Sequence, residues 1–405
     1  MNGGLLILVA LAAAPNPNRL EWGGVPAINY DSDLGFGFGA IGNVAKLSPN
    51  HVPYAWRLQL QLYAAAKESE TGDLEIPFQA HYLQFDFPGF VSPALRVNGE
   101  AAFRRFSNAG WYGLGSAAEE RADAPPKFYR YDRIFPSLLV NGRYALVDTP
   151  VDVGKRRLEL LVGTRITYNL TRPYDGSLLS RDIVDPELEP HLHGLDDHLL
   201  VQLHTGLLWD TRDDEFAPTR GTFTELSVRL AKAAGDDAQL AALYLGSSWF
   251  AALWKERLVA AVRADVDLIV GDPPFYELSG IGALARRDAP GGGRSLRGIL
   301  LQRFHGKLKA LLNLELRSQL LSYHLGEVRH RVGAVFFADV GRVWSDWSEV
   351  VVDGAPLDTP FSAFELGTGV GLRYHWGETF VIRADYGYSP TQGTSGLYIN
   401  VGQFF

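Results

Sequence analysis

The feature that most constrains this chain is a two-residue alternation of apolar and polar side chains that recurs along most of its length. In the stretch 258–268 every even position is apolar, whereas Arg263, Asp265 and Asp267 occupy odd positions. Successive side chains of a β-strand point to opposite faces, so the pattern predicts a strand with one apolar and one charged face. The stretch 307–320 divides in the same way, with leucines on one face and charged residues on the other.

About fifteen segments show this alternation, and connectors rich in Pro, Gly and Asp separate them. A single strand of this kind would also suit a soluble sandwich, with its apolar face in the core. Many such strands, with no stretch of helical period to cover them, favour an all-β transmembrane barrel that is apolar outside and polar inside. Because bacterial barrels have even strand numbers, we expect about 16 antiparallel strands.

Composition excludes other classes. The net charge is −8 and no basic stripe is visible, which argues against a nucleic-acid surface. No apolar run approaches the roughly 18 residues of a membrane helix. The chain has no cysteine, which suits folding in an oxidising compartment.

The longest apolar run lies near the N-terminus, from Leu5 to Ala14, and Pro15 follows it. Its length and its small residues predict a signal peptide over 1–14, although a short buried helix or strand is the alternative. We therefore expect export, a short periplasmic segment over 15–30, and a barrel over 31–405. A barrel of this class implies the bacterial outer membrane as its location.

A glycine-rich stretch, 291–293, precedes the predicted strand 307–320 and is followed by Ser295, Leu296, Arg297, Gly298 and Ile299. We expect this loop to fold into the lumen and to carry Arg297 with it. The alternative is a solvated arginine on a surface loop. An arginine inside a barrel needs a carboxylate partner, because an unpaired buried charge is costly.

The C-terminal half resembles the BamA/TamA-like superfamily of outer-membrane barrels, also called bacterial surface antigens. Ser295-Leu296-Arg297-Gly298-Ile299 is similar to the family's Val-Arg-Gly-aromatic loop motif, with Leu for Val and Ile for the aromatic residue. Three further resemblances are the strand motif at 337–344, the hairpin turn at 210–213 with 218–221, and the closing strands around 369–373 and 383–387. Their order and spacing together make the resemblance specific.

The resemblance implies that Arg297 pairs with an acidic strand residue, which here is Asp339. Glu315 and Asp385 are further candidate partners on lumen faces. It also implies a seam between the first and last strands that can open. The predicted seam residues are Gly35, Gly37 and Gly39 at one edge and Leu397, Ile399, Val401 and Phe405 at the other. A plain closed seam, with the glycines only making room for the loop, is the alternative.

The family inserts or moves other proteins across the outer membrane, so the resemblance implies an insertase or a translocation pore. Its members usually carry periplasmic POTRA modules, and this chain resembles one reduced to its barrel. The implied partners are outer-membrane lipids, and unfolded outer-membrane proteins or a periplasmic helper protein. A passive or gated channel, or a scaffold for an envelope partner, is the alternative function.

We expect no enzyme activity, cofactor or metal. His191, His193 and His198 lie with two aspartates in one polar loop. Such a group without a second ligand cluster is more often a solvated surface than a metal site.

Overall fold

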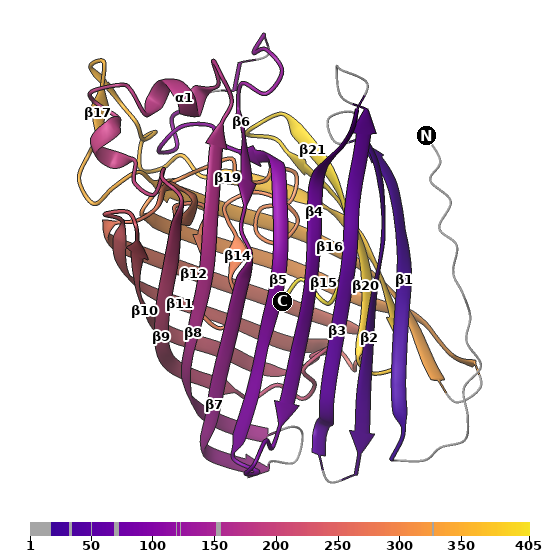
Figure 1. Ribbon diagram of the computed structural model, residues 1–405. Helices are drawn as coiled ribbons and strands as arrows, with labels where there is room; N and C mark the ends of the chain where they lie inside the picture. The colour runs from indigo at the N-terminus through magenta and orange to yellow at the C-terminus, as the bar shows by residue number, and fades with distance from the viewer. Residues whose placement is uncertain are drawn as a thin grey trace.

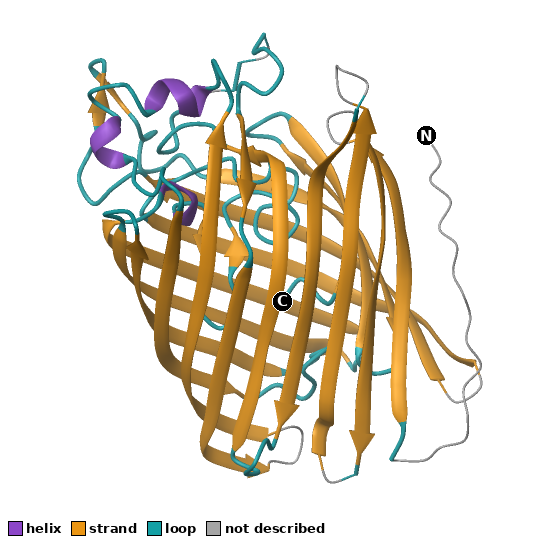
Figure 2. Ribbon diagram, in the orientation of Figure 1, coloured by secondary structure: helices purple, strands orange, loops and turns teal. Residues whose placement is uncertain are grey.

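The computed structural model describes residues 18–31, 35–49, 51–68, 73–118, 120–121, 123–150, 155–325 and 328–405. One large antiparallel sheet curls into a barrel that encloses a long loop (Figure 1, Figure 2). The strands of its first half are β1 (Leu20–Asp31), β2 (Gly35–Ser48), β3 (His51–Glu68), β4 (Leu74–Pro88), β5 (Leu95–Gly110), β6 (Arg130–Ile134), β7 (Ser137–Pro150) and β8 (Lys155–Pro173). Those of the second half are β9 (His198–Asp210), β10 (Gly221–Ala234), β11 (Gln239–Trp254), β12 (Leu258–Asp272), β15 (Leu308–Leu325), β16 (Val328–Trp344), β19 (Glu365–Trp376), β20 (Phe380–Ser389) and β21 (Thr394–Val401).

The 17 strands of this sheet fill 16 positions around the wall. Strands β6 and β7 share one position, because both lie between β5 and β8. Residues 135–136 interrupt what is otherwise a single long strand. The expected all-β antiparallel barrel of about 16 strands is therefore the fold of this chain.

The two ends of the barrel differ in the length of their connections. Long loops lie at the end that carries α1 (Leu178–Asp182) and η1 (Glu189–His191), at the top of Figure 1. The opposite end has short turns such as 255–257 and 377–379. Transmembrane barrels have short periplasmic turns and longer extracellular loops, which makes the α1 end the extracellular one.

Alternation along each strand separates an apolar outer face from a polar lumen. In β9, Leu203 on the outside is 59% exposed, whereas its neighbour His204 is 3% exposed. Apolar side chains on the outer face suit a lipid environment, and the buried polar groups face one another across the lumen. No helix among the described residues is long and apolar enough to cross a bilayer.

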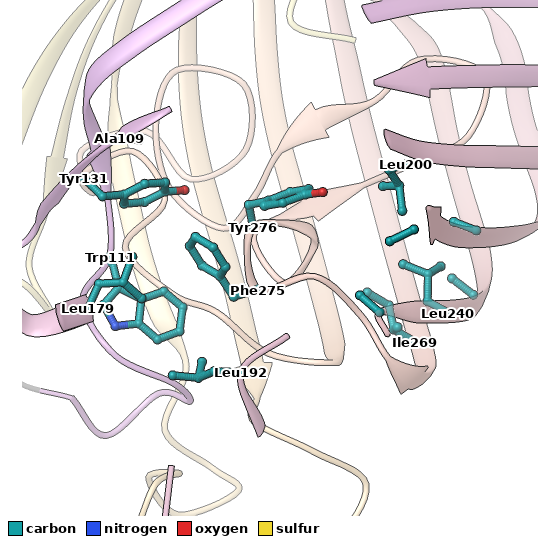
Figure 3. Close-up of a cluster of buried hydrophobic side chains, with 14 residues drawn as sticks. Ala109, Trp111, Tyr131, Leu179, Leu192, Leu200, Leu240, Ile269, Phe275 and Tyr276 are labelled. Carbon is teal, nitrogen blue, oxygen red and sulfur yellow. The ribbon is translucent and has the colours of Figure 1, made fainter. Parts of the chain in front are cut away.

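Apolar packing near the extracellular end anchors the loop that enters the lumen. Trp111 follows β5, Leu179 belongs to α1, and Phe275 begins the short helix η2 (Phe275–Glu277), as Figure 3 shows. The rings of Trp111 and Phe275 meet edge to face, with 5.5 Å between their centroids. Burial of such aromatic side chains is worth roughly 2–3 kcal/mol each. The cluster therefore fixes one end of the lumen loop against the wall.

The structure corrects the predicted start of the barrel. Strand β1 begins at Leu20, inside the stretch 15–30 that we expected to be a periplasmic segment. Gly23, Gly24 and Pro26 break the alternation there, which hid the sixteenth strand from the sequence. Proline lacks the backbone N–H and is tolerated mainly in edge strands, which is the position of β1. The predicted signal peptide over 1–14 lies outside the described residues.

Candidate functional site

The loop 273–307 connects β12 to β15 and folds into the lumen. Its strands β13 (Gly280–Ile281) and β14 (Arg287–Asp288) pair with each other rather than with the wall. The motif that follows is buried, with Ser295, Leu296 and Arg297 at 0% exposure and Ile299 at 1%. The Ser295 hydroxyl closes the turn, because it accepts from the Gly291 N–H at 3.0 Å and donates to the Gly291 carbonyl at 2.8 Å.

The guanidinium of Arg297 lies against three buried carboxylates of the wall. Its Nε and Nη2 donate to the two oxygens of Asp339 at 2.8 and 2.9 Å, which is a bidentate fork. Its Nη1 donates to Glu315 at 2.6 Å and lies 3.5 Å from Asp385. The rings of Phe337 and Phe404 lie over the same guanidinium, with centroids 3.5 and 3.8 Å from its carbon. The structure thus brings the predicted arginine together with all three of its predicted partners.

A second layer of arginines surrounds these carboxylates. Arg373 donates to Asp385 at 2.5 Å and Arg383 does so at 2.9 Å, while Arg317 donates to Glu315 at 2.7 Å. Glu315 and Asp385 therefore each have more than one arginine partner. The second side-chain partner of Asp339 is the Asn313 amide, which donates to it at 2.8 Å. Such a network holds its members in one arrangement, since loss of any partner would leave a buried charge without compensation.

Two glycines that the sequence did not single out make room for the motif. A Cβ on Gly367 of β19 would lie 2.0 Å from the Arg297 carbonyl oxygen. A Cβ on Gly387 of β20 would lie 2.7 Å from the Gly298 nitrogen. Gly298 itself has a φ of +94°, which disfavours any side chain. The signal in the sequence for Gly367 was the glycine at every second position of β19 from 367 to 371, whereas Gly387 is the single glycine of β20.

The motif also contacts the last strand of the sheet. The Tyr398 hydroxyl of β21 accepts from the Gly298 N–H at 3.0 Å. The Thr394 hydroxyl of the same strand donates to the Gly298 carbonyl at 2.6 Å. The lumen loop and the edge strand β21 are therefore joined at Gly298.

The seam of the barrel lies between β1 and β21. Within the described residues no backbone ladder joins β1 to β20 or β21, although β1 pairs with β2 along its whole length. The predicted seam glycines are placed wrongly by one strand, because Gly35, Gly37 and Gly39 belong to β2. The error has the same cause as the missed strand β1.

Side chains fasten one end of the seam. Glu21 at the start of β1 accepts hydrogen bonds from the N–H groups of Glu378 and Thr379, at 3.1 and 3.3 Å. These residues form the turn between β19 and β20. The Thr379 hydroxyl adds a third bond to the same carboxylate, at 3.2 Å. The seam is thus tied at its periplasmic end by one buried acid.

The other predicted seam residues divide between two environments. Leu397 and Ile399 of β21 face outward, at 68% and 66% exposure, and Val401 ends the strand. Phe405, which we predicted to lie at the seam edge with them, does not share that outer face. The backbone turns at Gly402, whose φ is +92°, and Phe405 lies in the lumen. Arg317 explains this position, because it donates to the Phe405 carbonyl at 2.8 Å and stacks on the ring.

The histidines of the extracellular loop do not converge. His191 lies near Asp346, His193 near Asp272, and His198 bonds to the Tyr276 hydroxyl. Among the described residues no group of three or more metal-ligating side chains has the geometry of an ion site.

Fold and site together define a transmembrane β-barrel whose lumen is braced by an inward-folded loop with a buried arginine. Residues 83–405 match the Omp85 superfamily domain, about four fifths of the chain. The protein belongs to the Omp85 superfamily and is an outer-membrane barrel of bacteria. A search of curated proteins found no match.

Solved structures support the fold. The barrel of BamA from Haemophilus ducreyi lacking POTRA domains 1–3 aligns with a TM-score of 0.50 at 15% identity, over 96% of this chain and 70% of that one. CdiB from Escherichia coli aligns with a TM-score of 0.54 at 14% identity, over 96% of this chain. This chain covers 62% of the CdiB chain. At such identities the likeness concerns the fold alone.

Proposed function

We propose that this barrel is an outer-membrane biogenesis factor that inserts or translocates outer-membrane proteins through the seam between β1 and β21. The observation that carries the proposal is the missing backbone ladder between these two strands within the described residues. Unpaired N–H and C=O groups along a strand edge are a template for another strand. An unfolded outer-membrane protein supplies such a strand.

The bilayer supplies the driving force for a client strand to pair with this edge. Backbone polar groups left unpaired in hydrocarbon cost several kcal/mol each, so an open edge favours whatever strand can satisfy it. Outer-membrane lipids surround the seam while a client strand pairs with it. A periplasmic helper protein is the partner that would deliver the client. The proposed activity requires no covalent chemistry and no cofactor.

The Tyr398 and Thr394 contacts favour an active seam over a passive one. Both side chains belong to β21 and both bond to Gly298 of the lumen loop. Displacement of β21 would therefore disturb the motif that holds Arg297. Opening of the seam and rearrangement of the buried network would therefore occur together, and such coupling suits a gate.

The alternative is a passive or gated channel, or a scaffold for an envelope partner. Open space remains in the barrel beside the lumen loop. Steady conductance through a wide pore, with no effect on client folding, would favour this alternative.

The test uses a disulfide across the seam, because the chain has no native cysteine. An ideal Cβ on Gly23 of β1 would lie 3.3 Å from the Cβ of Phe380 in β20. Disulfides join Cβ atoms about 3.5–4.5 Å apart, so Gly23→Cys with Phe380→Cys is close to bridging geometry. The folding rate of an unfolded outer-membrane protein would be followed in liposomes that contain the oxidised or the reduced variant.

A matched control places the bridge in the continuous wall. The hydroxyls of Thr224 in β10 and Ser247 in β11 are 2.6 Å apart, so Thr224→Cys with Ser247→Cys introduces a disulfide with little change of shape. We expect client folding to be accelerated by the wild type, the reduced seam variant and the oxidised control. The oxidised seam variant should not accelerate it. Equal acceleration with an oxidised seam would contradict the proposal, as would no acceleration by any form.

A further inference from the structure

A polar cavity of about 500 Å³ lies inside the barrel, between the lumen loop and the wall of β3, β4, β5, β7 and β8. We propose that this cavity binds small anions of the phosphate or carboxylate class. The proposal is independent of the seam, because none of the residues that carry it belongs to β1 or β21.

The lining of the cavity is strongly cationic. Seven arginines border it against four carboxylates, so guanidinium groups are in clear excess. The lining arginines are Arg57, Arg104, Arg133, Arg165, Arg286, Arg287 and Arg294.

Three of these arginines are neutralised by acids. Arg104 pairs with Glu100 at 2.7 Å, Arg286 with Glu277 at 2.6 Å, and Arg287 with Asp265 at 3.1 Å. These pairs use two of the four lining carboxylates.

A third lining carboxylate, Asp86, is bound by Arg96, which does not border the cavity. Of the four lining carboxylates only Asp288 has no arginine partner among the described residues, and the Gln302 amide donates to it at 3.3 Å.

The remaining four arginines have no carboxylate partner within the described part of the chain. Arg57 donates to Gln59 and Arg133 donates to Asn169, both neutral amides. The side chains of Arg165 and Arg294 make no hydrogen bond or ion pair there. The Nε of Arg165 is buried without any partner.

Arg133 is buried and Arg57 and Arg165 are half-buried, whereas Arg294 is exposed. Guanidinium groups withdrawn from water without acids are costly unless a ligand compensates them. The planar fork of arginine matches the paired oxygens of phosphate and carboxylate. A bound anion in the cavity would satisfy the open donors of Arg165 and offset the surplus positive charge. The cavity volume admits a group as large as pyrophosphate.

A vestibule of about 1720 Å³ opens at the extracellular end, and β4 and β5 contribute residues both to its lining and to that of the cavity. Arg303 lines the vestibule and is 3% exposed, and its Nε and Nη1 have no hydrogen-bond partner in the described part of the chain. This side chain adds a further arginine with open donors on the extracellular side of the barrel.

A single engineered cysteine can report the potential inside the cavity. Leu139 of β7 lines the cavity and lies directly opposite Arg165 in the β7–β8 register. We would measure how fast Leu139→Cys reacts with anionic sulfonatoethyl and cationic trimethylammonioethyl methanethiosulfonate. Each rate would be normalised to that of a cysteine in an unfolded peptide. If that variant fails to fold, Gln61→Cys on β3, which lines the same cavity, takes its place.

We expect the anionic reagent to react about ten-fold faster than the cationic one after normalisation. Adding Arg165→Gln should lower that preference about five-fold, because a unit charge next to the thiol is lost. The matched control is Arg172→Gln, which removes the same charge from the same strand, where Arg172 is 60% exposed and pairs with Asp197. It should leave the preference unchanged.

Sodium pyrophosphate should slow the anionic reagent at Leu139→Cys, and this protection should be lost with Arg165→Gln. Equal rates for the two reagents, or a faster cationic reagent, would overturn the proposal. Failure of both reagents to react at both cysteine positions would overturn it as well, because solutes would then not enter the cavity. An anionic preference that pyrophosphate does not reduce would mean that the cavity attracts anions without binding them, against the proposal.

Discussion

At the scale of single residues, Arg297 joins the lumen loop to three strands of the wall. Asp339 lies on β16, Glu315 on β15 and Asp385 on β20, and all three carboxylates are buried with the arginine. Desolvation opposes burying these charges, so the arrangement is stable only while every member has its partners. The network therefore favours one position of the loop more than it adds raw stability.

Replacing Arg297 with alanine should destabilise the barrel by about 3–5 kcal/mol, because three buried acids lose their shared partner. Arg297→Lys should recover part of that loss, since it keeps the charge but loses the bidentate fork. Urea unfolding in detergent, followed by tryptophan fluorescence, measures both. The control is Arg121→Ala, which removes an exposed arginine paired with Asp123 and should change little. Equal effects of the two alanine variants would contradict the buried-network account.

A methyl group at Gly367 should displace the motif. The added Cβ would meet the Arg297 carbonyl oxygen at 2.0 Å. The β19 backbone cannot move without breaking its ladder, and Arg297 is held in place by its bonds to Asp339. We expect Gly367→Ala to cost about 1–3 kcal/mol or more in the same unfolding measurement. Gly142→Ala is the matched control, since its nearest neighbour would be the Val162 carbonyl oxygen at 3.7 Å. Similar free energies of unfolding for the two variants would show that the loop does not pack closely against β19.

At the scale of elements, the packing of α1 depends on an acid in an apolar setting. Asp182 accepts a hydrogen bond from the Trp111 indole at 2.7 Å and is 7% exposed. Burial raises the pKa of the Asp182 carboxyl to about 6, although the Trp111 bond opposes the rise. The folded loop thus holds the proton more tightly than the unfolded chain does.

A raised carboxyl pKa stabilises the fold at low pH. The contribution is complete below the unfolded pKa near 3.8 and is lost as pH rises to about 6. We expect hydrogen exchange in 178–183, corrected for intrinsic rates, to show weaker protection at pH 7.5 than at pH 4.5. The difference is on the order of 2 kcal/mol.

Asp182→Asn keeps an acceptor for Trp111 and cannot ionise. Its protection should therefore be independent of pH and should match that of the protonated wild type. Protection that rises with pH in the wild type would reverse the assigned sign.

At the scale of the whole molecule, the described wall strands form one sheet whose neighbours all pair except β1 and β21. A disulfide between Gly23→Cys and Phe380→Cys would join strands near the two ends of the sheet. In the chain-entropy account, closing so long a loop contributes at least about 5 kcal/mol, whereas the short Thr224→Cys to Ser247→Cys loop contributes about 3 kcal/mol.

Heat resistance in detergent should therefore rise more for the oxidised seam variant than for the oxidised control. Reduction should return both to the wild-type value. A seam bridge that lowers heat resistance would mean that closure strains the barrel.

The strands of the wall were predictable because each carries its own alternation. The sequence located fifteen of the sixteen wall positions, and it failed at β1, where two glycines and Pro26 remove the pattern. The alternation of apolar and polar residues indicates which face of a strand meets lipid. An edge strand with few large side chains has no such alternation, so the sequence does not predict it. The error then moved the predicted seam from β1 to β2.

Some residues of the candidate site were likewise predictable from the sequence, and others were not. The resemblance of the loop motif to a known family selected Arg297 and its partner Asp339, and the alternation along the strands supported that pair. Glu315 and Asp385 were selected as further partners on lumen faces. Gly367, Gly387 and Tyr398 were not selected, because their roles arise only where the loop backbone lies against β19, β20 and β21.

The sequence by itself determined the class of fold, the polarity of its two faces and the arginine that the lumen receives. The fold class and the polarity of the faces follow from chemistry that each strand carries within a few residues, and the arginine follows from the resemblance of the loop motif to a known family. Only the tertiary structure decided which edges form the seam, that Phe405 turns inward, and that four arginines face one cavity without acids. Those features depend on contacts between residues far apart in the chain, and no local pattern encodes such distances.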